Sequence, residues 1–261
     1  MTAVKPKKAL GQHFLTDNVI AQRIASTVAD LECPIIEVGP GMGMLTRHLI
    51  DFHRPMKVVE IDKESVGWLR THVPELNVED IVEGDFLKMN LDEFFPGHRV
   101  CVIGNYPYNI SSQIFFHILN FRDKVTCCAG MLQKEVAERL AAKPGTKARG
   151  ILSVLLQAWY HVEYLFTVDE TVFNPVPKVK SGVIRITRNN VNELGCDEKQ
   201  FKTVIKTTFS QRRKTLRNSL KPLISPGWHP DPGVESMMGR RPEELSVDDF
   251  IQLTRAVYSL E

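Results

Sequence analysis

The chain has 261 residues, 43% of them hydrophobic and 25% charged, and carries a formal net charge of +2. This composition excludes a fibrous or largely disordered protein, and the length allows one large domain and a small one. No apolar run reaches the ~18 residues of a membrane span, and residues 1–8 lack the apolar core of a secretory signal. We therefore expect a cytoplasmic protein without a membrane partner. The five cysteines lack zinc-ligand spacing, so we expect no metal.

The chain opens with a basic arm followed by an amphipathic helix. Lys5, Lys7 and Lys8 precede the first acidic residue, Asp17. The side chain of Asp17 or Thr16 can cap a helix, and beyond them apolar residues recur at helical spacing as far as Leu31. This pattern predicts a helix that begins close to residue 17.

Short apolar runs then alternate with helical patterns. The runs have the length and the β-branched content of strands, whereas the segments between them have helical periodicity. Strands that alternate with helices are typical of an α/β fold with a parallel sheet. We expect strands at 34–38, 56–61, 77–82, 100–103 and 126–132, and helices at 45–52, 63–72 and 111–119.

The last part of this sheet has a different pattern. After a helix expected at 150–161, two extended segments, 164–168 and 183–187, flank the proline-rich run from Phe173 to Pro177. Such a pair predicts an antiparallel edge on an otherwise parallel sheet. Because the composition turns polar between Arg188 and Asp197, we place a linker there and expect two domains, residues 1–188 and residues 189–261.

The residues after the linker predict a small all-helical domain. Apolar residues from Phe201 to Phe209 share one helix face, and the segment from Met237 to Leu260 supplies a further helix that Ser246 can cap. If residues 201–220 formed one straight helix, Arg212 would point to the apolar side. Either the helix breaks near residue 210, or Arg212 is held against the neighbouring domain.

A glycine-rich turn and two acidic residues follow the first three strands. Gly39, Gly41 and Gly43 lack the spacing of a dinucleotide fingerprint, which argues against a nicotinamide dehydrogenase. Glu60, after the second strand, suits ribose hydroxyls, and Asp85, after the third, can accept from an adenine amino group. Each carboxylate alone could be an ordinary exposed one. Together with the turn they fit S-adenosylmethionine, whose cationic sulfonium suits acidic neighbours.

The run Asn105-Tyr106-Pro107-Tyr108 follows the fourth strand. The Asn105 side chain and the Pro107 carbonyl can accept hydrogens from an exocyclic amine, and Tyr108 can stack on the base that bears this amine. The alternative is a proline turn with a half-buried tyrosine. Because open α/β sheets bind ligands at the carboxyl ends of their strands, we expect these residues to be catalytic and to lie beside the cofactor.

Basic residues are concentrated between Lys199 and Lys221. This stretch holds eight Lys and Arg residues and no Asp or Glu. Such a cluster favours a polyanion such as nucleic acid, because each neutralised phosphate releases condensed counterions. The alternative is a solvated helix face, which many charge runs are.

Four segments resemble the small-subunit ribosomal RNA adenine dimethyltransferases, and the resemblance covers essentially the whole chain. The segment in the basic tail is specific to this group, whereas the middle two are shared with many amino-methyltransferases. Tyr106 stands where the family usually has leucine, and His13 where asparagine is common. The four segments are Leu10 to Leu15, Glu37 to Gly41, Gly104 to Ser111 and Ser210 to Leu220.

The resemblance implies a Rossmann-like class I methyltransferase fold with a helical RNA-binding domain. It implies N6,N6-dimethylation of two adjacent adenines in the hairpin near the 3′ end of 16S rRNA, within a partly assembled small ribosomal subunit, with S-adenosylmethionine as methyl donor. A ribosome-assembly factor in which docking matters more than catalysis, and a DNA adenine methyltransferase, are the alternatives. No interface signal is visible, so we expect a monomer.

Single residues take expected roles in this scheme. The catalytic residues would be Asn105, Pro107 and Tyr108. The resemblance implies a cofactor pocket lined by His13, Leu15, Gly39, Glu60, Asp85 and Asn105, to which we add Gly41. We expect RNA contacts from Arg212, Arg213, Lys214 and Arg217, and from Phe173, which could stack on the target base or serve as a hydrophobic plug between domains.

Overall fold

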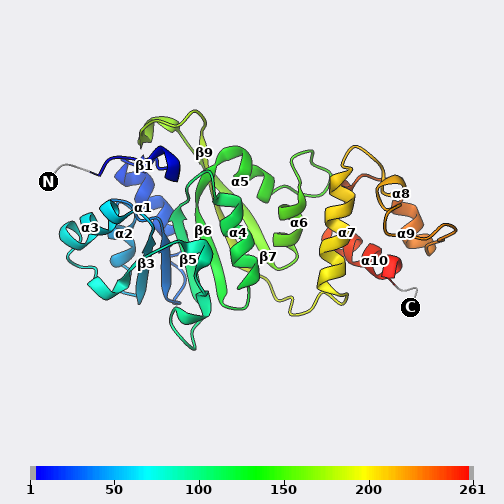
Figure 1. The fold of residues 1–261 in the computed structure, drawn as a ribbon, viewed down its shortest axis with the longest axis horizontal. Helices are drawn as coiled ribbons and strands as arrows, with labels where there is room; N and C mark the ends of the chain where they lie inside the picture. The colour runs from blue at the N-terminus through cyan, green and yellow to red at the C-terminus, as the bar shows by residue number, and fades with distance from the viewer. Residues whose placement is uncertain (1–3, 259–261) are drawn as a thin grey trace. The chain divides into compact units, whose positions relative to one another are not determined.

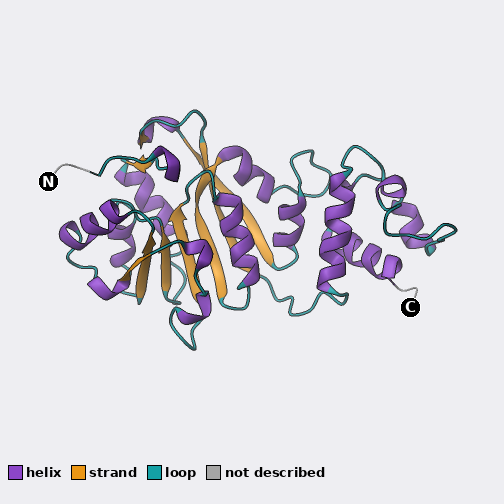
Figure 2. Cartoon of the chain, in the orientation of Figure 1, coloured by secondary structure: helices purple, strands orange, loops and turns teal. Residues whose placement is uncertain are grey.

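A computed structural model of the chain describes residues 4–258. They divide into two compact units, the first formed by residues up to 138 with 162–188, and the second by 139–161 with the residues from 189 onward. In Figure 2 most strands gather in one large sheet, whereas the described residues beyond 188 form helices and loops. Segment 139–161, which the sequence grouped with the sheet, packs with the second unit. The functional division into residues 1–188 and 189–261 stays a prediction, because compactness assigns no function.

The first unit contains a seven-stranded sheet in the order β4-β3-β2-β5-β6-β9-β7, visible in Figure 1. Strands β2 to β6 pair in parallel, and β9 pairs with β6 in the antiparallel sense. This arrangement confirms the predicted α/β fold with a mostly parallel sheet and an antiparallel edge. The strands are β2 (Ile35–Val38), β3 (Met56–Glu60), β4 (Ile81–Glu83), β5 (Val100–Asn105), β6 (Val125–Gln133), β7 (Tyr160–Val168) and β9 (Ser181–Arg188).

Helices cover the sheet, and α4 lies over it in Figure 1. Alternate strand residues such as Ile35, Cys101 and Ile103 join the core that α1, α2 and α3 complete, as the two-residue period of a strand requires. Asp17 caps α1, since its carboxylate accepts from the amides of Val19 and Ile20. The helices are α1 (Asn18–Ser26), α2 (Thr46–Ile50), α3 (Lys63–His72), α4 (Ser111–Asn120) and α5 (Lys134–Leu140).

Two predicted elements differ from the observed ones. In the strand expected at 77–82, residues Val78–Asp80 form a 3-10 turn, and only Ile81–Glu83 pair in the sheet. The Asn77 side chain donates to Asp80 at 3.0 Å, a local bond that favours a turn over a strand. The helix expected at 150–161 ends at Gln157, because Tyr160 already begins β7.

The N-terminal arm pairs with a distant segment, which the sequence did not predict. Strand β1 (Phe14–Leu15) lies antiparallel to β8 (Phe173–Asn174), with Leu15 opposite Phe173. Next to this pair, the Thr16 amide donates to the Val172 carbonyl at 2.9 Å. The arm is therefore fastened beside the sheet rather than extended into solvent.

The second unit is helical in its described part. Helix α7 ends at Ser210 and is capped by Gln211, so the first of the two alternatives, a break near residue 210, is confirmed. Ser246 and Asp249 exchange hydrogen bonds at the start of α10, which confirms the predicted cap. Residues 259 and 260 of that predicted helix lie outside the described residues. The helices are α6 (Ile151–Gln157), α7 (Glu198–Ser210), α8 (Leu216–Ser219), α9 (Pro232–Met237) and α10 (Val247–Tyr258).

Within residues 4–258, no helix has both the length and the apolar character that a bilayer crossing requires.

Candidate active site

Two neighbouring cavities open at the carboxyl ends of the parallel strands. Their volumes are about 90 and 220 Å³, which together reach the lower end, about 300 Å³, of typical ligand pockets. Both are lined by Phe14, Gly39, Gly41 and Asn105. The first is also lined by five further residues that the sequence placed in the site, namely His13, Glu60, Asp85, Pro107 and Tyr108.

The turn after β2 needs its glycines. Gly39 and Gly41 have φ angles of +68° and +57°, in the left-handed region that other residues rarely adopt. A β-carbon at Gly41 would lie 2.9 Å from the Phe14 ring. The turn thus brings bare backbone to the wall shared by the two cavities, as a tightly held ligand requires.

Glu60 ends β3 and is almost fully buried. Its two carboxylate oxygens accept from the Gly41 amide at 3.0 Å and from the Asp62 amide at 2.9 Å. Burial raises the pKa of the Glu60 carboxyl, and the two amides oppose this effect. Each oxygen keeps a second lone pair, so the oriented carboxylate can still accept from a ligand diol.

Asp85 lies beyond the end of β4, where its Oδ1 accepts from the Leu87 amide at 3.1 Å. Its Oδ2 lies 3.6 Å from the Lys88 ammonium. The carboxylate therefore has a fixed orientation at the rim of the first cavity and retains acceptor capacity.

Asn105 is the last residue of β5, and within residues 4–258 only the nitrogen of its side-chain amide has a hydrogen-bond partner. The Nδ2 atom donates to the His13 carbonyl at 3.0 Å, which leaves Oδ1 as an acceptor. The Pro107 carbonyl closes a turn by accepting from the Ile110 amide at 3.2 Å. A carbonyl has two lone pairs, so Pro107 can accept one further hydrogen.

Tyr108 forms an aromatic pair with His13. The two rings are stacked, with centroids 5.4 Å apart and planes inclined by 29°. The Tyr108 hydroxyl pairs with Ser181 Oγ at 2.5 Å, and His13 Nδ1 donates to the Pro175 carbonyl at 2.7 Å. Both rings are thus anchored to the segment 175–181, and together they form one wall of the first cavity.

Leu15 and Phe173 are placed by the β1–β8 pair. Leu15 is buried and lines the second cavity. Phe173 is only 3% exposed and belongs to the hydrophobic core of the first unit. The expectation that Phe173 stacks on a base is therefore corrected, because pairing of β8 with the N-terminal arm turns its ring into the core.

The four basic residues expected to contact RNA fall into two pairs. Arg212 donates to the Lys147 carbonyl and lies 4.0 Å from Glu243, and Arg217 pairs with Glu235. Arg213 and Lys214 are exposed, and among the described residues no contact of their side chains is found. Two of the predicted cations thus have partners within the second unit, although Arg217 is itself exposed, and the other two face solvent.

Glu37 was not predicted as a site residue, yet it lines the second cavity. It is 1% exposed, and its Oε2 has no hydrogen-bond partner within the described structure. Burial raises the pKa of this carboxyl to about 8, and nearby Glu60 adds to the rise. The signal in the sequence was one acidic residue within an otherwise apolar strand.

Tyr106 is also buried, although it lies in the catalytic run. Its hydroxyl donates to the Ala129 carbonyl at 2.7 Å and lies 3.0 Å from Cys128 Sγ. The ring covers two glycines, since a β-carbon at Gly104 or Gly130 would lie 3.1 or 2.7 Å from it. Tyr106 therefore anchors the turn from behind, and it also contributes to the lining of the first cavity.

No group of three or more His, Cys, Asp or Glu side chains within residues 4–258 could hold a metal ion.

The parallel sheet, the glycine turn and the polar strand ends define a Rossmann-like methyltransferase. A family profile described as "Ribosomal RNA adenine dimethylase" matches residues 3–255. The chain belongs to this family, and it is accordingly an S-adenosylmethionine-dependent ribosomal RNA adenine dimethyltransferase.

Curated relatives and solved structures agree with this assignment. "Ribosomal RNA small subunit methyltransferase A" of Bacteroides fragilis is 60% identical over 258 residues, which cover 98% of this chain and 94% of the relative. The protein of the same name from Parabacteroides distasonis is 60% identical over 255 residues, covering 97% and 94%. A dimethyladenosine transferase from Plasmodium falciparum shares the fold, with a TM-score of 0.75, 24% identity and coverage of 92% and 96%. The structure of the 23S rRNA methyltransferase ErmE has a TM-score of 0.71 and 25% sequence identity, and the match covers 94% of this chain and 99% of ErmE.

Proposed function

We propose that this chain dimethylates N6 of two adjacent adenines in the 3′-terminal hairpin of 16S rRNA. It acts in the cytoplasm, as a monomer, on a partly assembled small ribosomal subunit. The 60% identical relatives named small subunit methyltransferase A support this substrate. The observation that carries the chemistry is Asn105, whose Nδ2 is held by the His13 carbonyl so that Oδ1 is left to accept.

The residues at the strand ends fit S-adenosylmethionine. Glu60 would accept from the ribose hydroxyls and Asp85 from the adenine amino group, while the bare turn at Gly39 and Gly41 admits the ligand. Glu37, buried and unpartnered in the second cavity, would face the cationic amino-acid end. When bound, the cofactor supplies an electrophilic methyl group on sulfur. A bound cation would favour the ionised form of Glu37, whose pKa burial raises to about 8.

The methyl acceptor is an amine whose lone pair is delocalised into the adenine ring. Acceptors at Asn105 Oδ1 and the Pro107 carbonyl would hold the amine hydrogens and favour the tetrahedral geometry that frees the lone pair. Fixing the nitrogen in line with the methyl group lowers the barrier further. No strong base is needed, since the nitrogen-bound proton becomes acidic once the methyl group has been transferred.

The target adenine must leave its stack to reach this turn. Extrusion of a base costs a few kcal/mol, and stacking on an aromatic ring returns about 1–3 kcal/mol. Tyr108 is the proposed platform, and its stack with His13 makes that platform rigid. Because Phe173 is buried, it is not part of this proposal.

RNA outside the pocket would be held by the basic segment beyond α7. Arg213 and Lys214, which face solvent, would contact phosphates, with Arg212 and Arg217 beside them. Such contacts position RNA without reading its sequence. The proposal therefore assigns methyl transfer to residues 1–188 and RNA positioning to residues 189–261.

Methyl transfer to unmodified small subunits tests the proposed substrate. Subunits from cells that lack this enzyme are incubated with it and with labelled S-adenosylmethionine, and the rRNA nucleosides are analysed by mass spectrometry. We expect N6,N6-dimethyladenosine at two adjacent positions near the 3′ end. Label confined to large subunits, or to a DNA duplex offered in parallel, would overturn the proposed substrate.

A further inference from the structure

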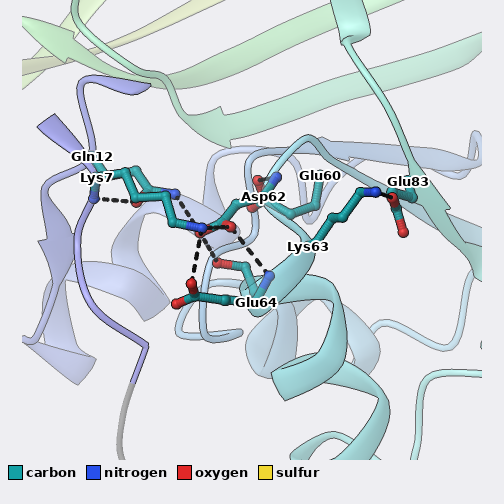
Figure 3. Close-up of polar contacts among 8 residues, drawn as sticks. Lys7, Gln12, Glu60, Asp62, Lys63, Glu64 and Glu83 are labelled. Atoms are coloured by element: carbon teal, nitrogen blue, oxygen red, sulfur yellow. Dashed lines mark hydrogen bonds and ion pairs between the residues drawn. The ribbon is translucent and has the colours of Figure 1, made fainter. Parts of the chain in front are cut away.

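The N-terminal arm reaches the cofactor site through two side chains that converge on one carboxylate (Figure 3). Lys7 Nζ lies 2.5 Å from Asp62 Oδ1, and Gln12 Nε2 donates to Asp62 Oδ2 at 3.2 Å. The Lys7 amide also donates to the Gln12 side-chain carbonyl at 2.7 Å. These bonds close residues 7–12 into a loop whose two ends meet at Asp62.

Asp62 is suited to hold this loop. It is 2% exposed, and it also accepts from the Glu64 amide at 3.1 Å and the Ser65 hydroxyl at 3.3 Å. Burial opposes its ionisation, yet the hydrogen bonds from Lys7 and Gln12 outweigh it and lower the pKa of Asp62. The buried carboxylate is therefore charged at neutral pH.

The same residue orients the proposed ribose acceptor. The Asp62 amide donates to Glu60 Oε1 at 2.9 Å, as drawn in Figure 3. The backbone of Asp62 thus holds Glu60, while its side chain holds the arm. Any shift of the arm that displaces Asp62 also displaces the carboxylate that faces the ligand.

The other end of the arm reaches the catalytic turn. Residues 10–14 line the first cavity, and the His13 carbonyl accepts from Asn105 Nδ2 at 3.0 Å. The arm therefore connects the ribose end of the cavity to the methyl-transfer end. Lys7 remains partly exposed, with 39% of its side chain accessible, and Glu64 lies 3.2 Å from it, so the fastening can open without unfolding the sheet.

We propose that Lys7, Gln12 and Asp62 form a latch that fastens the arm along the cofactor cavity, and that this latch and cofactor binding stabilise each other. The inference rests on the proposed cofactor residues. By linkage, a latch that favours the binding-competent wall tightens cofactor binding, and bound cofactor in turn protects the arm. Lys7 and Asp62 are positioning residues, because they act through Glu60 and the arm, whereas Gln12 also lines the first cavity.

The variants Lys7→Met and Asp62→Asn test the latch, with Lys8→Met as matched control because Lys8 is an exposed neighbour on the same arm. Binding of S-adenosylhomocysteine is measured by calorimetry, and hydrogen exchange of residues 5–14 is measured without ligand. We expect about tenfold weaker binding and faster arm exchange in both variants, the order expected for losing one hydrogen bond to a charged group. At saturating cofactor, kcat should change less than the KM for the cofactor.

The double variant Lys7→Met/Asp62→Asn separates a latch from two unrelated defects. If the residues act together, the double variant binds no more weakly than the worse single variant. Unchanged binding and unchanged arm exchange in Lys7→Met, or simple additivity in the double variant, would overturn the latch. If Asp62→Asn fails to fold, Lys7→Met and Gln12→Leu decide the matter. Failure of the unaltered protein to bind S-adenosylhomocysteine would instead refute the proposed cofactor site itself.

Discussion

The strand ends and the basic segment 210–220 both carry residues that we propose for the reaction, but they hold them differently. At the strand ends, Glu60 and Asn105 are each oriented by hydrogen bonds from or to backbone groups. In the basic segment, Arg213 and Lys214 face solvent. Charges in a low-dielectric interior interact strongly and respond to pH, whereas exposed charges are screened by salt. The two regions should therefore differ in the size and the kind of their mutational effects.

The largest effect should come from Asn105→Ala. Losing one preorganised group at a reacting centre typically costs about 10²–10³-fold in kcat, and we expect that loss in single-turnover transfer of labelled methyl to small subunits. Cofactor and RNA binding are measured separately, because Asn105 also holds the arm through His13. Asn109→Ala, an exposed amide on the same turn, is the control. Equal rates in the two variants would remove Asn105 from the mechanism.

Glu37→Gln tests whether the buried Glu37 carboxyl is protonated in the folded protein. The pKa of Glu37 is raised from 4.5 to about 8 in the folded protein, so folding takes up a proton between these values. Its contribution to stability is therefore greatest at low pH and is lost as pH rises from about 4.5 to 8. Glutamine cannot ionise and should remove this dependence.

At pH 8 we expect Glu37→Gln to have a free energy of unfolding higher than that of the unaltered protein by a margin on the order of 2–4 kcal/mol, and therefore to unfold at a higher temperature. At pH 5 the difference should shrink, and calorimetry at both values checks it. Glu75→Gln, at an exposed position, should show no such trend. A margin that is the same at both pH values would contradict a buried, protonated Glu37.

The sequence was informative where local chemistry decides the structure. A cap at Asp17 or Thr16, the glycine turn and the helix at 63–72 were predicted because each depends on residues within a few positions of one another. Strand alternation placed Glu60, Asp85 and Asn105 at one sheet edge, where the structure brings them around one cavity.

Contacts between distant residues could not be predicted in this way. Phe173 is buried because β8 pairs with Leu15 and Phe14, about 160 positions earlier in the chain. Arg212 and Arg213 are neighbours in the sequence, but only Arg212 reaches Lys147 and Glu243. No local pattern distinguishes a cation that has an internal partner from one that faces solvent.

This distinction can be tested with two double variants. Arg213→Gln/Lys214→Gln removes the solvent-facing pair, and Arg212→Gln/Arg217→Gln removes the pair with internal partners. We expect the first to weaken RNA binding about tenfold at low salt and to reduce the slope of log affinity against log salt by about 1.5, because each phosphate contact contributes about 0.7–0.9 to that slope.

The second double variant serves as the matched control of equal charge. It should change the salt slope less and thermal stability more, because it breaks contacts inside the second unit. Filter binding of the 3′-terminal hairpin at several salt concentrations provides the slopes. Equal slopes in the two variants would show that internal pairing does not decide which cations contact RNA.

Tyr106→Phe should have the smallest effect, and it tests only the buried residues behind the strand ends. The substitution keeps the ring over Gly104 and Gly130 but removes the hydroxyl that donates to the Ala129 carbonyl. One buried hydrogen bond contributes about 0.5–1.5 kcal/mol, so we expect the melting temperature to fall by roughly 2–4 °C. Tyr164→Phe is the control, since that hydroxyl pairs with Thr167 in an exposed setting and should contribute almost nothing. If the two variants lose equal stability, burial does not strengthen the hydrogen bond of the Tyr106 hydroxyl. The expected difference between buried and exposed polar groups would then fail at the residue where it is easiest to measure.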